Sequence, residues 1–424
     1  MKFTVKSVLA GMLLAMSAAH ANPIAITNAK IFSVGDAGTV EKGVVVIDNG
    51  KIIAVGADVA VPSGARVIDA SGKQITPGLA SAYTGIGVEE LPSIEQTVDS
   101  ENKNERFSAA LTLGAAVNPN STLIPVNRIL GLTRAIVVPH SSRNVFEGQA
   151  ASIFLGMGDD LVLNEHAAMF VDLTEGAVES AGGSRAGALL TIREAFEDAK
   201  YWAEHHEDLL PKPHDYSLPV LDLKALQLVL AGTQPLVVEV NRASDIRAVL
   251  KLKSDYPALK LIIAGGAEAW MVADALAKAG VSVLMDPMQN LPGTFDALAI
   301  RIDGPALLAK AGVKLLFRGE DSHKAFLVRQ GAGTAVANGL DYDAALKAMT
   351  VNIAEAFGIA NYGAIKAGND ADLVIWDGDP LEVTTNADQV FIRGEAIPMV
   401  SRATRLRDRY RELPSNAIPV DYRK

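Results

Sequence analysis

Residues 74–90 read QITPGLASAYTGIGVEE. Ile75 to Tyr83 is a short apolar run that carries one Pro-Gly pair, and two glycines, Gly85 and Gly87, follow it. An apolar run of strand length that ends in glycines is typical of a buried strand that breaks into a loop. We therefore expect a functional site at this break.

Further apolar runs of strand length follow along the chain and alternate with helical segments. The predicted strands are Leu132 to Val138, Leu236 to Val240, Leu259 to Ala264, Val281 to Met285 and Val313 to Phe317. Asn144 to Gly187 holds many glycines between strand-like pieces, so the third and fourth strands stay unassigned. The alternation predicts an α/β fold, a TIM-like (β/α) barrel.

Short strands at both ends of the chain predict a second, smaller domain. Val44 to Ile47 and Lys51 to Val55 flank an Asp-Asn-Gly turn at 48–50, and Asn-Gly is the pair that type I′ hairpin turns prefer. Ala371 to Trp376 and Gln389 to Arg393 are strand-like near the other end. We expect 22–74 and 367–400 to form one small β domain beside a barrel at 75–366.

The first 21 residues have the parts of a secretory signal peptide in order. Lys2 and Lys6 accompany the apolar run Val8 to Met16, and Ala19-His20-Ala21 is a small-x-small cleavage site. The chain contains no cysteine, which excludes disulfides, thiolate chemistry and a lipid-carrying cysteine. We expect a periplasmic or secreted protein without a membrane anchor.

Composition and charge limit the classes of partner. The 424 residues are 49% hydrophobic, enough to bury a large core, and the formal net charge of −10 disfavours nucleic acid and anionic membranes as partners. Residues 401–424 form a basic tail with five arginines between 402 and 411. Such a run is usually a solvated helix face or pairs with the chain's own carboxylates, and docking of a partner is the alternative.

Two stretches resemble a known family. Ile75 to Leu79, ITPGL, resembles the start of the first barrel strand of the amidohydrolase superfamily, in its imidazolonepropionase-like branch. Residues 363–381, GAIKAGNDADLVIWDGDPL, are similar to the family's closing signature. The resemblance covers nearly the whole chain after residue 21. It implies the barrel, the composite β domain and hydrolysis of carbon–nitrogen bonds other than peptide bonds.

The family's site, as the resemblance implies it, is a centre of one or two metal ions held by histidines of strands 1, 5 and 6, a carboxylated lysine or glutamate of strand 4 and an aspartate of strand 8. Here Tyr83 and Gly85 match the histidines of strand 1, and Glu239 and Asn241 match strand 5. Gly265 stands about where strand 6 should carry its histidine. Neither a phenol nor a glycine replaces imidazole as a zinc ligand, so we expect no metal or other cofactor.

Asp321 matches the family's strand 8 aspartate and is the candidate catalytic residue. Other polar residues fall near predicted carboxyl ends of strands, where barrel active sites form. These candidate pocket residues are Tyr83, His140, Glu239, Asn241, Glu268 and His323. We expect this barrel mouth to bind a small molecule.

Two functions remain open. In the first, a periplasmic protein of this hydrolase lineage has largely lost its own metal site, and it binds a ligand in the barrel mouth or pairs with a second copy or an intact homologue. In the second, the protein is an active amidohydrolase with a rebuilt site, in which Asp321 is the base, His140 or His323 assists it, and zinc is the metal. The Asp321→Asn substitution separates them, because only an enzyme must lose turnover while keeping its fold.

Overall fold

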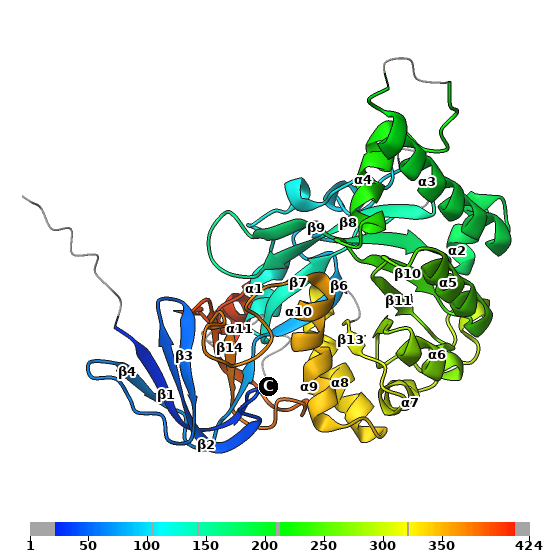
Figure 1. Cartoon of the computed structure of the whole chain (residues 1–424). Helices are drawn as coiled ribbons and strands as arrows, with labels where there is room; N and C mark the ends of the chain where they lie inside the picture. The colour runs from blue at the N-terminus through cyan, green and yellow to red at the C-terminus, as the bar shows by residue number, and fades with distance from the viewer. Residues whose placement is uncertain (1–21, 104–105, 142–143, 209–212, 320–321, 412–424) are drawn as a thin grey trace, which may run out of the picture.

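The computed structural model describes residues 22–103, 106–141, 144–208, 213–319 and 322–411. The predicted signal peptide, Asp321 and the end of the basic tail lie outside these residues. Two eight-stranded sheets organise the described part of the chain, and Figure 1 shows them next to each other, one made largely of the blue N-terminal strands.

The smaller sheet combines both ends of the chain. Its strands are β1 (Ile24–Phe32), β2 (Thr39–Asp48), β3 (Lys51–Gly56), β4 (Arg66–Asp69), β5 (Gln74–Pro77), β14 (Leu373–Trp376), β15 (Ala387–Ile392) and β16 (Glu395–Ala396). β5 joins the two ends, because it pairs parallel with β1 and antiparallel with β14. The predicted hairpin is confirmed: β2 and β3 are antiparallel around Asn49 and Gly50, whose φ angles of 47° and 78° suit a type I′ turn.

The larger sheet forms a nearly closed barrel in the order β13-β12-β11-β10-β9-β8-β7-β6. Its strands are β6 (Leu79–Thr84), β7 (Leu132–Val137), β8 (Phe146–Phe154), β9 (Val162–Asp172), β10 (Leu236–Val240), β11 (Leu261–Gly265), β12 (Ser282–Met285) and β13 (Leu315–Phe317). Alternate strand residues such as Ala82, Ile136, Phe170 and Leu284 pack into one buried cluster inside the barrel.

The region left unassigned in the sequence supplies two barrel strands, and one of them runs backwards. β8 is antiparallel to both β7 and β9, so no crossover helix is needed between these three strands. Strict (β/α) alternation therefore fails here. The reversal also places the first residues of β8 at the carboxyl end of the parallel strands, since Phe146 pairs with Val171 of β9.

Helices cover the outside of the barrel and follow most of the parallel strands (Figure 1). They are α1 (Leu123–Arg128), α2 (Glu175–Val178), α3 (Arg185–His205), α4 (Val220–Leu230), α5 (Ala243–Asp255), α6 (Ala273–Lys278), α7 (Gly304–Lys310), α8 (Val328–Ala337), α9 (Tyr342–Ala348), α10 (Val351–Phe357) and α11 (Arg402–Arg411). Among the described residues, no helix combines the length and apolar character that a membrane span requires.

The run Ile75 to Tyr83, predicted as one strand, is two strands that belong to different sheets. Gly78 separates them, and its amide donates to the Asp372 carbonyl at 2.8 Å. A Cβ atom at Gly78 would lie 2.2 Å from the Thr133 hydroxyl oxygen, so only glycine lets the chain pass this closely to β7. The prediction was wrong because the apolar pattern does not change where the chain leaves one sheet for the other.

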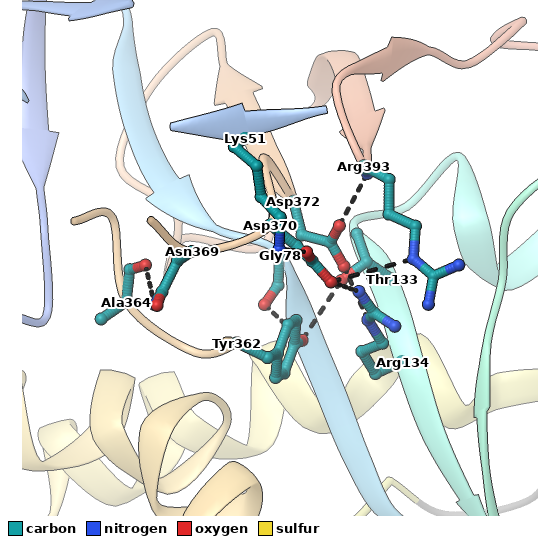
Figure 2. A network of polar contacts seen from close by, with 10 residues as sticks. All are labelled: Lys51, Gly78, Thr133, Arg134, Tyr362, Ala364, Asn369, Asp370, Asp372 and Arg393. Carbon is teal, nitrogen blue, oxygen red and sulfur yellow. Dashed lines mark hydrogen bonds and ion pairs between the residues drawn. The ribbon is translucent and has the colours of Figure 1, made fainter. Parts of the chain in front are cut away.

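A buried ion-pair network joins the two sheets (Figure 2). Arg134 of β7 is 1% exposed, and its guanidinium donates to Asp372 at 2.8 Å and to Asp370 at 2.9 Å. Tyr362 lies under the same guanidinium and donates to the Gly78 carbonyl at 2.6 Å. Because both carboxylates come from the segment that enters β14, the network fixes the β domain against the amino-terminal end of the barrel.

Candidate functional site

Five charged or phenolic side chains converge at the carboxyl ends of the barrel strands. Tyr83 lies in β6, Glu147 in β8, Asp172 at the end of β9, Glu239 in β10, and Arg318 directly after β13. β10 pairs in parallel with β9, and Glu239 is opposite Asp172 in that register. Active sites of barrel enzymes form at this end, because loops of all strands meet there.

Tyr83 and Glu147 meet through His140, which follows β7. The Tyr83 hydroxyl lies 3.3 Å from His140 Nδ1, and the same nitrogen lies 3.6 Å from Glu147 Oε1. Burial raises the pKa of the Glu147 carboxyl to about 7, although His140 opposes this rise. Partial burial lowers the pKa of His140, but the Glu147 carboxylate outweighs it, so that this pKa lies above its ordinary value. The pair therefore shares a proton near neutral pH.

Glu239 is the second carboxyl with a strongly altered environment. Burial raises its pKa, and the charge of Arg318 opposes the rise. The Arg318 guanidinium also lies 4.5 Å from the centre of the Tyr83 ring. Burial raises the pKa of the Tyr83 phenol well above its ordinary value, and Glu239 and Glu147 add to the effect. Tyr83 is thus a neutral hydrogen-bond donor at physiological pH.

A cavity of about 260 Å³ opens beside this cluster. Glu239, Arg318 and Thr174 line it together with the loop that follows β12. Glu239 Oε1 is buried and has no hydrogen-bond partner among the described residues. An unsatisfied carboxylate oxygen in such a position costs free energy of about 1–3 kcal/mol or more, unless a ligand or water supplies a donor.

A glutamate occupies the space beside Gly85, the position that the sequence resemblance matches to the second histidine of strand 1. A Cβ atom at Gly85 would lie 2.3 Å from Glu89 Cδ, so the glycine makes room for this side chain. The Glu89 carboxylate accepts hydrogen bonds from Ser100 at 2.6 Å and from Ser322 at 2.8 Å. The Ser322 hydroxyl accepts in turn from the Gly85 amide at 2.8 Å. Glu89 is therefore fixed in the space that a side chain at position 85 would occupy.

The residues of the mouth do not fit the metal centre that the family implies. Tyr83 stays protonated, and the space at Gly85 is occupied by a carboxylate already engaged with two serines. In the described parts of the chain, no group of three His, Asp or Glu side chains is arranged to hold a metal ion. We therefore derive no chemical step through a metal.

The other predicted pocket residues have separate places. Asn241 borders the cavity and donates to Asp296 at 3.2 Å. Glu268 accepts from the Ala243 amide at 2.8 Å, where it caps the first turn of α5. His323 is exposed on the 3₁₀ helix η6 (Ser322–Leu327). Asp321, the predicted catalytic residue, lies outside the described residues.

Four residues of the mouth were not predicted from the sequence: Glu89, Glu147, Asp172 and Arg318. Glu147 and Asp172 belong to strands that could not be assigned there, and Glu89 comes from the acidic loop after the first strand. Arg318 could have been predicted, because it follows directly after a strand that was correctly predicted. A charged residue at that position of a barrel strand faces the mouth.

Comparisons with known proteins agree with this architecture. The model of the Amidohydrolase family matches residues 237–397, from β10 to the end of the β-domain sheet. The protein "Amidohydrolase tasK" of Hapsidospora irregularis is 24% identical over 376 residues, which cover 77% of this chain and 37% of that protein. The chain thus spans little more than a third of the length of this relative.

Solved structures share the fold across most of the chain. An amidohydrolase from Thermotoga maritima MSB8 matches with a TM-score of 0.79 at 23% identity, covering 89% of this chain and 100% of that one. Molinate hydrolase matches with a TM-score of 0.54 at 17% identity, covering 90% of this chain and 95% of that one. Together with the closing signature at 363–381, the composite sheet and the eight-stranded barrel, these similarities lead to one conclusion: the chain has the fold of the amidohydrolases, and residues 237–397 match the Amidohydrolase family.

Proposed function

We propose that the barrel mouth binds a small molecule that carries amine, amidine or guanidine groups, and that it does so without a metal ion. The observation that supports this most directly is the buried Glu239 Oε1, which lacks a donor at the wall of a cavity. A cationic N–H group would satisfy this oxygen and gain from its charge.

The charges around the cavity support the same class of ligand. Glu239 and Arg318 line the cavity itself. In the rest of the barrel mouth, the carboxyls of Glu89, Glu147 and Asp172 outnumber the basic side chain of His140. Burial raises the pKa values of Glu147, Asp172 and Glu239, and repulsion from neighbouring carboxylates adds to the rise. A bound cation would reduce the repulsion, so ligand binding and ionisation of these carboxyls should support each other.

Size and surroundings limit the ligand further. A cavity of about 260 Å³ is slightly smaller than the roughly 300–1,000 Å³ typical of drug-sized ligands, so the ligand is a small metabolite. Leu291 lines the cavity and is 81% exposed, and Phe295, four residues further on, is 85% exposed. An apolar portion of the ligand would cover part of this rim. The chain performs this binding as a periplasmic or secreted protein.

Two measurements test the proposal. Calorimetric titration with agmatine, which carries an amine and a guanidine, should detect binding that Glu239→Gln weakens about tenfold or more, the effect of one lost charge-assisted pair. The exposed Glu194→Gln variant of α3 is the matched control and should bind as the wild type does. Elemental analysis after incubation with Zn²⁺ should find well below one ion per chain. Stoichiometric zinc that falls in Asp321→Asn would refute the metal-free site.

The second candidate, an active hydrolase with a rebuilt site, is favoured by one observation. His140 and Glu147 form a coupled pair with a carboxyl pKa of about 7, which suits general acid–base catalysis at neutral pH. In this case Asp321 acts as base with His140 or His323. Loss of turnover on model amides in both Asp321→Asn and His140→Gln, with unchanged unfolding midpoints, would support catalysis over binding alone.

A further inference from the structure

A second, larger cavity of about 710 Å³ lies at the opposite end of the barrel, where the β domain meets it. Its walls include the hairpin turn at Asn49 and Gly50 and the first half of β7. The end of β8 near Ser152, the start of β9 near Asn164 and the segment that follows α10 complete them. None of the residues of the barrel mouth lines it. The two cavities are therefore separate candidate sites.

Positive charge is in excess on its walls. Lys51, Arg134 and Arg393 line the cavity together with Asp370, and Asp372, which is not a lining residue, pairs with Arg134 at 2.8 Å, so these five residues have an excess of one positive charge. Lys51 Nζ lies 2.5 Å from Asp370 Oδ1, and an Arg134 nitrogen lies 2.9 Å from Asp370 Oδ2. Each oxygen of the Asp370 carboxylate therefore already pairs with a cation, Lys51 or Arg134.

Arg393 is the cation that remains available to a ligand. Its Nε is 3.8 Å from Asp370 Oδ2, beyond hydrogen-bond distance, and its side chain is 45% exposed. The guanidinium lies 4.2 Å from the centre of the Phe154 ring. In Figure 2 its two terminal nitrogens point away from both aspartates. Contact with an aromatic ring holds a guanidinium in place and leaves its planar fork of donors free for a carboxylate or phosphate.

Tight turns of the backbone line part of the cavity. Asn49, Asn361 and Arg393 all line the cavity and have positive φ angles of 47°, 54° and 49°. Asparagine tolerates this region, whereas arginine rarely adopts it. Arg393 and Gly394, with φ angles of 49° and 77°, form the two-residue turn between β15 and β16, and these angles suit a type I′ turn. The turn places Arg393 at the cavity wall.

We propose that this cavity binds a small oxyanion, a carboxylate or a phosphate, through the fork of the Arg393 guanidinium, with Lys51 as a second positive charge. The cavity also offers the neutral side chains of Asn49, Ser152 and Asn361 to the remainder of the ligand. This site goes beyond the function proposed for the barrel mouth, because it uses other residues and attracts the opposite charge. If one of the two sites does not bind its probe, the proposal for the other site is unaffected.

Calorimetric titration of the full mature chain with succinate and with inorganic phosphate tests this, at an ionic strength held constant with sodium chloride. At least one of the probes should bind with a dissociation constant of about 1 mM or lower. Arg393→Asn should weaken that binding about tenfold or more, because asparagine suits the positive φ but lacks the charge and the fork. The tighter probe identifies the oxyanion class.

Arg301→Asn is the matched control, since Arg301 is 44% exposed and does not line this cavity. It should bind the probe as the wild type does. Arg393→Lys keeps the charge without the fork, and an intermediate affinity is expected. The proposal is wrong if neither probe binds to the wild type at about 10 mM, or if Arg393→Asn, folded with the wild-type melting temperature, binds as tightly as the wild type.

Discussion

Glu147→Gln should change how the stability of the protein depends on pH. The folded state raises the pKa of this carboxyl from 4.5 to about 7. Between these two values the folded chain keeps a proton that the unfolded chain releases, so the free energy of unfolding falls as pH rises through this window. At about 1.36 kcal/mol per pH unit, a window of about 2.5 units corresponds to roughly 3 kcal/mol.

Glutamine has the same shape but does not titrate, so this loss should be absent from the variant. His140 acts in the same direction, because its raised pKa gives stability that is present at low pH and lost as pH rises through the folded value. Without Glu147 that contribution shrinks as well. The free energy of unfolding of the variant, measured relative to that of the wild type, should therefore rise by about 3 kcal/mol between about pH 4.5 and pH 8.

Urea unfolding of both proteins at these two pH values measures the difference directly. The wild type should lose stability towards pH 8, and the variant should lose much less. If the difference in unfolding free energy between the two proteins is the same at both pH values, Glu147 is not a buried carboxyl with a raised pKa, and the account of the barrel mouth fails with it.

Two further substitutions test the fold that carries the sites. Arg134→Met should lower the unfolding free energy by about 3–5 kcal/mol, because it leaves the buried Asp372 unpaired, and adding Asp372→Asn should restore part of this loss in a double-mutant cycle. Gly85→Ala should cost about 1–3 kcal/mol in urea unfolding, because its Cβ would meet Glu89, whereas Gly293→Ala, with no atom within 4 Å, should be nearly neutral.

The sequence predicted most of the fold, because parallel barrel strands are buried on both faces and read as apolar runs. The five barrel strands predicted after the run 75–83 are all present, as β7 and β10 to β13. The Asn49-Gly50 turn was equally legible, since its positive φ angles restrict the choice of residues. Local chemistry decides these features, so no knowledge of distant contacts was needed.

The candidate site was harder to predict because long-range contacts assemble it. Glu147 faces the mouth only because β8 runs antiparallel, and the apolar pattern of a strand does not reveal its direction. Glu89 comes from a loop and lies against Gly85, and the need for a glycine at that position depends on this contact. Tyr83 and Glu239 were found because they occupy positions that the family resemblance already marked.

The positions that the resemblance matches to the family's histidines share one chemical property, since none of them carries an imidazole. These positions hold Tyr83, Gly85, Glu239, Asn241 and Gly265, and the Glu89 carboxylate lies where a side chain at position 85 would stand. A mouth that had merely lost function would be expected to fill with apolar or neutral side chains, because unpaired buried carboxylates are costly. Several carboxyls in the mouth, with one oxygen each of Glu147 and Glu239 left without a partner among the described residues, are what the proposed cationic ligand would require.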